Sequence, residues 1–522
     1  MNYSLLRKIR IVVSLFFLII TTFLFIDIYD LITPIVSNKI TFLQLVPSLL
    51  KFISILSFSA FGFLIIFSLT FFFGRIYCST ICPLGTFQDV INFISKKIKR
   101  KKRIENLYLN EIKWLRFSIL SLVILAFIFG VTLGVNLFDP YSIYGRIAGN
   151  FFKPILVGIN NLISYILENF KFFWLSPYNI KSFNFYPFII SLSFLILIIV
   201  LAWKKGRLYC NSICPVGTLL GYLSNSSFIK IRIKEKDCLS CGACAKDCKA
   251  NCIDTLNKKI DVTRCVVCFD CLTSCPIEGI TFSYSTKVKN KNYIVDDNKR
   301  NFFKKTSVYL LSLTTIAAQI EKQIKITKPS KIPIFRKKAV SPPGSKGLEY
   351  FNSKCTACHL CVSSCPTQVL QPSFLEYGFT GMLQPRLDNN AGFCNYECNI
   401  CTEVCPTGAI LPIKIEEKKL TQLGIAKFIK ENCVVHTQKT DCGACSEHCP
   451  TKAVHMIPYE GNLVIPEVRE KYCIGCGACE YACPVIPYKA IYVEGNQIHK
   501  KAEVNNENNI QQKIDLKEDF PF

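Results

Sequence analysis

The chain has 522 residues, half of which are apolar, and its mean hydropathy of +0.30 is high for a soluble protein. Lysine and arginine outnumber aspartate and glutamate by 62 to 37, which gives a net charge of +25. The basic residues sit beside apolar segments, a pattern typical of membrane proteins and not of nucleic-acid binders. No histidine precedes His359, which excludes a haem b with an axial imidazole in the N-terminal part.

Residues 1–225 are predicted to form an α-helical membrane domain of four helices. The four apolar stretches that approach the ~20 residues needed to cross a bilayer are Ile11–Ile26, Phe52–Gly74, Phe117–Phe138 and Ser182–Trp203. A shorter stretch, Pro154–Leu167, is flanked by charge and predicts an interfacial or loop helix, with entry into the bilayer as the alternative. Basic clusters at 7–10, 96–103 and 204–207 fall on one side of four spans, which predicts that this side is the cytoplasm.

A short element occurs twice, as Gly74–Thr86 and Gly206–Thr218, at an offset of 132 residues. Both copies read G-R-x-Y-C-x3-C-P, so we expect a duplicated hairpin whose two elements face each other. The cysteines of these elements are candidate catalytic groups, redox-active or close to a quinol, namely Cys78, Cys82, Cys210 and Cys214. They could jointly bind a metal or cluster, or act as redox thiols beside Arg75 and Arg207. The third alternative is that they are buried small residues next to a helix-stopping proline.

Residues 226–298 contain two runs close to C-x2-C-x2-C-x3-C-P, the bacterial ferredoxin signature. In each run the first three cysteines hold one cluster and the fourth reaches the neighbouring cluster, so the runs work in pairs. This rule predicts a cytoplasmic dicluster domain with two ligand sets. They are Cys238, Cys241, Cys244 with Cys275, and Cys265, Cys268, Cys271 with Cys248.

Residues 347–500 contain four more runs and are predicted to form two further dicluster modules of the α+β bacterial-ferredoxin type. The expected sets are Cys355, Cys358, Cys361 with Cys405; Cys394, Cys398, Cys401 with Cys365; Cys433, Cys442, Cys445 with Cys483; and Cys473, Cys476, Cys479 with Cys449. In total, 24 of the 29 cysteines would supply the iron of six 4Fe–4S clusters. Residues 501–522 are polar and charged and are expected to be a disordered tail.

Three other interpretations of these cysteines compete with iron–sulfur binding. Structural zinc sites use two well-separated C-x2-C pairs, and disulfide scaffolds are short secreted domains, so neither fits four cysteines within eleven or so residues. Residues 355–359 also read as C-x2-C-H, the attachment motif of c-type haem. Because such a haem would take two ligands from a complete ferredoxin run, we expect no haem, and no flavin motif is present.

Between the two ferredoxin regions, residues 299–346 combine a basic cluster, a short apolar stretch from Thr306 to Ile320, and a Lys- and Pro-rich linker. The apolar stretch is short for a membrane span and fits the hydrophobic part of an export signal. Its basic pair followed by Phe and Lys resembles a twin-arginine signal with Lys first. We therefore expect residues 347–500 to lie outside the cytoplasm; the alternative is an anchoring helix inside it.

The two G-R-x-Y-C-x3-C-P elements followed by a dicluster segment resemble the NapH type of quinol dehydrogenase membrane subunit, over about residues 1–290. Residues 300–490 resemble the NapG and MauM type of ferredoxin, so the whole chain resembles a NapH–NapG fusion, related to NosR- and CcoG-type proteins. One departure is Lys249, where the family usually has proline, with Cys252 shortly after it. This leaves open whether Cys248, favoured by spacing, or Cys252 is the fourth ligand.

The resemblance implies a multi-pass inner-membrane protein that takes electrons from quinol and passes them through its clusters to an anaerobic respiratory reductase. Its expected partners are the membrane, quinol or quinone and reductase subunits, with no nucleic acid. Its quinone type, terminal acceptor and direction of electron flow are left open by the sequence. Because some relatives assist metal-site maturation or regulation, an accessory role is the alternative.

Overall fold

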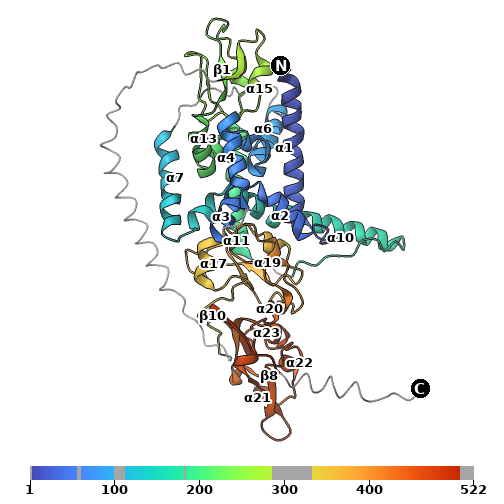
Figure 1. Cartoon of the computed structure of the whole chain (residues 1–522). Coiled ribbons are helices and arrows are strands. Elements are labelled where there is room, and N and C mark those ends of the chain that lie inside the picture. The colour runs from blue at the N-terminus through green and yellow to red at the C-terminus, as the bar shows by residue number, and fades with distance from the viewer. Residues whose placement is uncertain are drawn as a thin grey trace, which may run out of the picture.

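The computed structural model describes residues 3–55, 60–98, 108, 112–181, 184–284 and 332–505. The described chain is arranged in three tiers (Figure 1). A small ferredoxin block, residues 226–284, lies at the top of the view, a layer of helices lies in the middle, and residues 332–505 form a larger block below. The expected export-like segment lies almost wholly outside the described residues, as does the tail from residue 506 onward.

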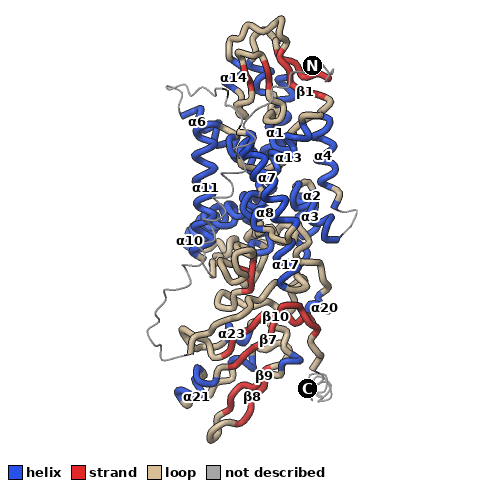
Figure 2. The backbone as a smooth tube through the Cα atoms, turned by 90° about the vertical axis from the view of Figure 1, so that its left-hand side faces the viewer, coloured by secondary structure: helices blue, strands red, loops and turns tan. Residues whose placement is uncertain are grey.

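The helical layer is built from the first 225 residues (Figure 2). Its helices are α1 (Tyr3–Ile26), α2 (Pro34–Phe42), α3 (Leu45–Ile55), α4 (Gly62–Phe73), α5 (Tyr77–Thr80), α6 (Pro83–Ile98), α7 (Lys113–Ile128), α8 (Leu133–Phe138), α9 (Pro140–Ile147), the π-helix η2 (Ala148–Phe152), α10 (Lys153–Asn169), α11 (Phe185–Lys205), α12 (Leu208–Ser212) and α13 (Pro215–Ser224).

Two of these helices, α1 and α11, are long and apolar enough to cross a membrane, with 24 and 21 residues. The other two expected spans are not single long helices in the described chain. Helix α4 has 12 residues, and α7 has 16. Helix α7 ends before Gly130, which adopts φ +77°, a conformation that commonly terminates helices, and α8 starts only at Leu133. The expected stretch Phe117–Phe138 is therefore divided into two helices.

The outward faces of the layer are apolar. On α7, Leu122 and Ile128 are 57% and 70% exposed, and α1 and α11 carry further exposed Ile, Phe and Leu side chains. Exposed apolar surface of this extent is unusual on a soluble monomer and indicates contact with lipid or a partner. The expected interfacial helix is present as α10, which projects sideways from the layer in Figure 1.

Both ferredoxin blocks are made of two-stranded antiparallel sheets and short helices. In the upper block β1 (Ile229–Ile233) pairs with β4 (Ile280–Tyr284) and β2 (Ile253–Asp254) with β3 (Lys259–Ile260), beside α14 (Ala243–Asp247) and α15 (Asp270–Ser274). In the lower block the pairs are β5 (Leu370–Pro372) with β6 (Pro385–Leu387), β7 (Thr421–Phe428) with β10 (Ile491–Lys501), and β8 (Val454–Pro458) with β9 (Val464–Val468). Each cysteine run ends in or beside a short helix, which supplies the third cysteine.

The helices of the lower block are also short. They are α17 (Leu348–Lys354), α18 (Leu360–Ser363), α19 (Ile400–Val404), α20 (Ile415–Lys419), the 3-10 turns η5 (Lys430–Asn432) and η6 (Glu470–Tyr472), α21 (Val434–Gln438), α22 (Ala444–Glu447) and α23 (Ala478–Ala482). The end of the stretch expected to be a linker belongs to this block. Val340 and Ser341 are buried, and the Val340 carbonyl accepts a hydrogen bond from the Leu387 amide at 3.0 Å.

The lower block packs directly on the helical layer. Asn38 of α2 donates to the Glu403 carbonyl at 3.0 Å, Ser54 of α3 to the Thr407 carbonyl at 3.2 Å, and Thr132 to the Asn352 carbonyl at 2.7 Å. One continuous buried core includes side chains from the upper block, the layer and the first lower module, whereas the second lower module has a core of its own. The two ferredoxin blocks are therefore joined through the interior of the helical layer.

A buried carboxylate ties the top of the layer together. Asp89 of α6 accepts from Arg207 at 2.7 Å, from Arg10 of α1 at 3.2 Å and from Lys249 of the upper block at 3.3 Å. Lys249 also pairs with Asp270 at 3.2 Å, so this residue, which departs from the pattern of the NapH-type proteins that the chain resembles, connects the layer to the upper block.

We expect Asp89→Asn to destabilise the protein strongly, because removing one partner of a buried ion pair leaves buried cations uncompensated, at a cost of about 3–5 kcal/mol. The measurement is the temperature at which the detergent-solubilised protein loses its visible absorbance. The control is Asp247→Asn, which removes an exposed 3.9 Å pair with Lys96 and should change little. Equal stability of the two variants would show that the Asp89 contacts are not structurally important.

Candidate functional site

The cysteine loops share an unusual backbone conformation. In four of the six runs, the residues on either side of the second cysteine both have positive φ. These pairs are Ser240 and Gly242, Val267 and Phe269, Ala357 and His359, and Gly475 and Gly477. Five of these eight residues are not glycine or asparagine, so the conformation is costly and must be enforced by what the loop surrounds.

In the upper block, a cavity is lined by Cys238, Cys241, Cys244 and Cys275. These are the four cysteines that the spacing rule groups together, although they come from both runs. Cys248 lies close enough to Cys268 and Cys271 to affect both electrostatically, and Cys265 affects Cys271 in the same way. The second set of four cysteines therefore also lies together.

The lower block repeats this arrangement four times. One cavity is lined by Cys365, Cys394, Cys398 and Cys401, and another by Cys433, Cys442, Cys445 and Cys483. In each of the remaining two sets, the thiols lie close enough to interact electrostatically. These sets are Cys355, Cys358, Cys361 with Cys405, and Cys473, Cys476, Cys479 with Cys449. The structure thus brings the 24 cysteines into six groups of four.

The groups have the chemistry that an iron–sulfur cluster needs. Burial raises the pKa of Cys445 and Cys476 to about 12, so these thiols keep their protons unless a metal replaces them. Backbone amides donate to the sulfurs, for example Ala453 to Cys449 at 3.2 Å and Gly279 to Cys275 at 3.3 Å. Such N–H···S contacts stabilise negative charge on a cluster and so help to set its potential.

A single metal ion fits these groups less well. Among the residues that the structure describes, no three Cys, His, Asp or Glu side chains come together closely enough to hold one ion. Wider groups suit a cubane, since each thiolate there binds a different corner of the cluster. His359 of the C-x2-C-H motif is buried, and its Nε2 lies 2.8 Å from the Leu383 carbonyl.

Cys252 lies beside the second set of the upper block. Its Sγ is 3.6 Å from that of Cys248, and it also contacts Cys265. The structure therefore places five thiols around this group, and both candidates for the fourth ligand are within reach. In the sequence, spacing favours Cys248 as the fourth ligand and Cys252 is the alternative. Because the two thiols lie close together in the structure, both remain candidates.

The four cysteines of the repeated element converge inside the helical layer. Cys78, Cys82, Cys210 and Cys214 are each at most 4% exposed, and each lies within electrostatic range of others in the set. We call this group the layer tetrad. The two copies have matching local hydrogen bonds, such as the amides of Cys82 and Cys214, which donate to Tyr77 and Tyr209 at 3.0 and 3.1 Å.

The two copies also contact each other reciprocally. Arg75 of the first copy donates to the Cys210 carbonyl at 3.3 Å, and Arg207 of the second donates to the Cys78 carbonyl at 2.5 Å. Gly85 and Gly217 permit this approach, because a Cβ at either position would lie 2.3 Å from the carbonyl oxygen of Cys78 or Cys210.

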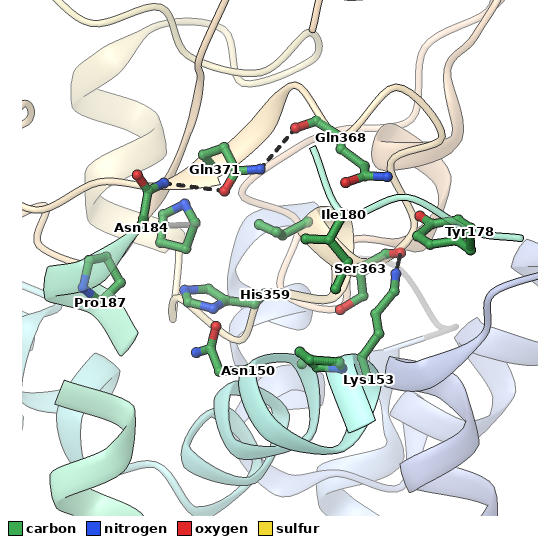
Figure 3. A pocket seen from close by; sticks show the side chains of 14 residues that line it. Asn150, Lys153, Tyr178, Ile180, Asn184, Pro187, His359, Ser363, Gln368 and Gln371 are labelled. Carbon is green, nitrogen blue, oxygen red and sulfur yellow. Dashed lines mark hydrogen bonds between the residues drawn. The ribbon is translucent and has the colours of Figure 1, made fainter. Parts of the chain in front are cut away.

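A cavity with both polar and apolar lining residues opens where α10 and α11 meet the lower block (Figure 3). Its wall includes Asn150, Lys153, Tyr178, Asn184, His359, Ser363, Gln368 and Gln371. Lys153 donates to the Ser363 carbonyl at 2.7 Å, and Asn184 donates to Gln371 at 3.2 Å. His359 and Ser363 flank Cys361, so this cavity adjoins a cysteine group. Sequence analysis noted His359 only as part of a C-x2-C-H motif, and it missed the cavity because residues 150–184, which form the opposite wall, carry no motif.

Comparison with protein families gives matches at both kinds of cysteine site. A 4Fe–4S binding domain matches residues 57–101 and 187–234, which contain the repeated element, and 4Fe–4S dicluster domains match residues 354–410 and 440–486. Each half of the first match contains two cysteines, both belonging to the layer tetrad. No solved structure matches the chain.

Several characterised and uncharacterised proteins are similar over part of the chain. An uncharacterized protein of Methanocaldococcus jannaschii is 24% identical over 227 residues, covering 43% of this chain and 70% of that protein. YccM of Escherichia coli, whose name assigns it to electron transport, is 26% identical and covers 42% and 53%. The methylamine utilization ferredoxin-type protein MauM of Methylophilus methylotrophus is 28% identical and covers 27% and 60%. The chain is thus a polyferredoxin with 4Fe–4S binding and dicluster domains, related to YccM and MauM.

We expect Cys361→Ser to remove one EPR signal and about four irons per chain, because each cubane holds four irons. The signals of the upper block should be unchanged, since its cysteine groups are separated from Cys361 by the helical layer. The control is Ser363→Ala, which changes a neighbouring side chain without removing a thiol. Loss of no iron would contradict the assignment of Cys361 as a ligand.

Proposed function

We propose that this polyferredoxin is a membrane-bound electron-transfer protein that oxidises quinol and delivers the electrons to a respiratory reductase. The observation that carries the proposal is the series of cysteine groups extending from the cavity at the edge of the helical layer into the lower block. When bound, the 4Fe–4S clusters supply one-electron carriers. The chain's own residues hold the clusters, exclude water from them and set their potentials.

The proposed topology has four spans, based on α1, α4, α7 and α11, which run alongside one another between the two blocks (Figures 1 and 2). The basic residues Lys96, Lys204 and Arg7 lie at the end of the layer that carries the upper block. Positive charge on that side supports a cytoplasmic upper block, and the lower block at the opposite end would then lie outside the cytoplasm.

We propose that the quinol binds in the cavity of Figure 3. It has the features of a small-molecule site, with polar side chains converging on a concave space beside apolar helices. Lys153 Nζ lies 5.8 Å from the ring centre of Tyr178. The wall therefore offers both an aromatic ring and hydrogen-bond donors to the head group of a quinol. Helix α10 projects from the layer next to the cavity, where a lipid-soluble substrate would arrive.

The residues around the cavity would offer a quinol one hydrogen-bond acceptor and one electron acceptor, and its protons would leave through the cavity opening to water. Oxidation of one quinol to quinone releases two electrons and two protons. Burial and the nearby Arg146 lower the pKa of His359 to about 3, so its imidazole is neutral, and Nε2–H donates to Leu383. The other ring nitrogen is left as an acceptor for a quinol hydroxyl, while the adjoining Cys361 group is the first acceptor for an electron.

The groups of the lower block continue away from the cavity. The Cys394 amide donates to the Cys476 carbonyl at 2.9 Å, which joins the first lower module to the second. Electrons would therefore leave through the second module, whose surface would contact the reductase. The relatives named for electron transport and for methylamine utilization support a relay role.

The test is anaerobic mixing of membranes with a reduced quinol analogue while cluster absorbance is followed. Asn150→Trp should slow quinol-dependent reduction at least about tenfold by filling the cavity, while dithionite-reducible iron is unchanged. Ser191→Ala is the matched control, because it removes the 2.8 Å hydrogen bond donated by Asn150 but leaves the cavity open. If quinol reduces no cluster in the wild type and deletion causes a metal-insertion defect, an accessory role replaces this proposal.

Sidedness can be tested at two matched hairpin turns. One protease site is inserted in the β8–β9 turn near Gly461, and the same site in the β2–β3 turn near Asn257. In right-side-out membrane vesicles, the first site should be cut and the second protected, because the blocks are expected on opposite faces. Protection of both sites, with cleavage after detergent is added, would overturn export of the lower block.

A further inference from the structure

We infer that the layer tetrad holds one further 4Fe–4S cluster, placed between the upper and lower ferredoxin blocks. Cys78 and Cys82 come from one copy of the repeated element, and Cys210 and Cys214 from the other, so neither copy alone could complete the site. The binding inference stands on the tetrad itself; only its role in carrying electrons across the membrane rests on the topology included in the proposed function, with the two blocks on opposite faces.

Hydrogen-bond donors around the tetrad would stabilise negative charge on its sulfur atoms. The Gln88 side-chain amide donates to Cys210 Sγ at 3.3 Å, the Gly217 amide to Cys214 Sγ at 3.3 Å, and Arg75 approaches Cys78 Sγ at 3.8 Å. All four thiols are buried, so these donors are not exchanged with water. N–H···S contacts of this kind match those around the ferredoxin groups.

Charge gives an independent argument. Arg75 is fully buried, and within the described part of the chain its hydrogen bonds go to carbonyls, an amide and Cys78, with no carboxylate among them. Its Nε has no hydrogen-bond partner, and neither does Nη2 of Arg207. A buried cation without an anion is strongly unfavourable. Four thiolates around a cubane give the net negative charge that Arg75 lacks, whereas Arg207 is already paired with Asp89.

The position of the tetrad connects it to both blocks. Above it, Arg75 donates to the Thr263 carbonyl at 2.9 Å, two residues before Cys265, and Asn211 donates to the Ala250 carbonyl at 2.9 Å. Below it, Tyr209 donates to the Phe138 carbonyl at 3.1 Å, and Arg146 of α9 reaches the Ala357 carbonyl at 3.4 Å, next to Cys358. A cluster here would carry electrons through the layer between the two blocks.

The experiment counts iron and acid-labile sulfide in the anaerobically purified full chain, with native mass spectrometry as a second measure. Seven clusters require about 28 of each per chain, and six require about 24, since each cubane holds four of both. Cys78→Ser and Cys210→Ser should each lose about four irons and the same EPR signal. The signals of the six ferredoxin groups should remain, which also shows that the variants fold. Ser79→Ala, a buried neighbour in α5, is the control and should retain every signal.

A wild-type content of about 24 irons, with the tetrad recovered as free thiols or as disulfides after denaturing alkylation, would overturn the inference. This result does not depend on any variant folding. The outcome is also separate from that of the proposed function. A protein with 28 irons that quinol fails to reduce would retain the seventh cluster and lose the quinol assignment, whereas rapid reduction of a protein with 24 irons would do the reverse.

Discussion

The structure depends on the reciprocal contact between the two copies of the repeated element. Each copy sends its arginine to the cysteine carbonyl of the other, and a glycine in each copy makes room for it. Because the arginines also contact the upper block, as Arg75 does at Thr263, the same contact fixes that block on the layer. Loss of this contact would separate four buried cysteines and remove one carbonyl acceptor from each of two buried arginines.

The spacing of the cysteines in the sequence predicted which of them belong to each ferredoxin group. The positions of three close cysteines and a distant fourth predicted which residues meet, because a loop of this length can surround only one cluster. The sequence also located α1, α10 and α11 from apolar composition. It could not show that Phe117–Phe138 divides at Gly130, since one glycine in an apolar stretch is often tolerated within a helix.

Other features depend on tertiary contacts that leave no local signal. The cavity between α10, α11 and the lower block is formed by residues far apart in the sequence, such as Lys153 and Ser363, which are 210 positions apart. Residues 339–345 pack into the lower block, but the sequence predicted a linker there because the neighbouring residues are rich in Lys, Pro and Ser. Lys249 looked like a departure from a family pattern, whereas in the structure it links Asp89 to Asp270 across the boundary between layer and block.

The layer tetrad resolves a difficulty that the sequence raises. In the proposed topology the two ferredoxin blocks lie on opposite faces of a membrane and need a carrier between them, and no histidine that could ligate a haem occurs among the first 358 residues. The most direct test of a continuous cluster path is an anomalous difference map recorded at the iron edge from crystals grown without oxygen. We expect iron at the six ferredoxin groups and a seventh peak enclosed by Cys78, Cys82, Cys210 and Cys214. Iron in both blocks with none in the helical layer would contradict the account.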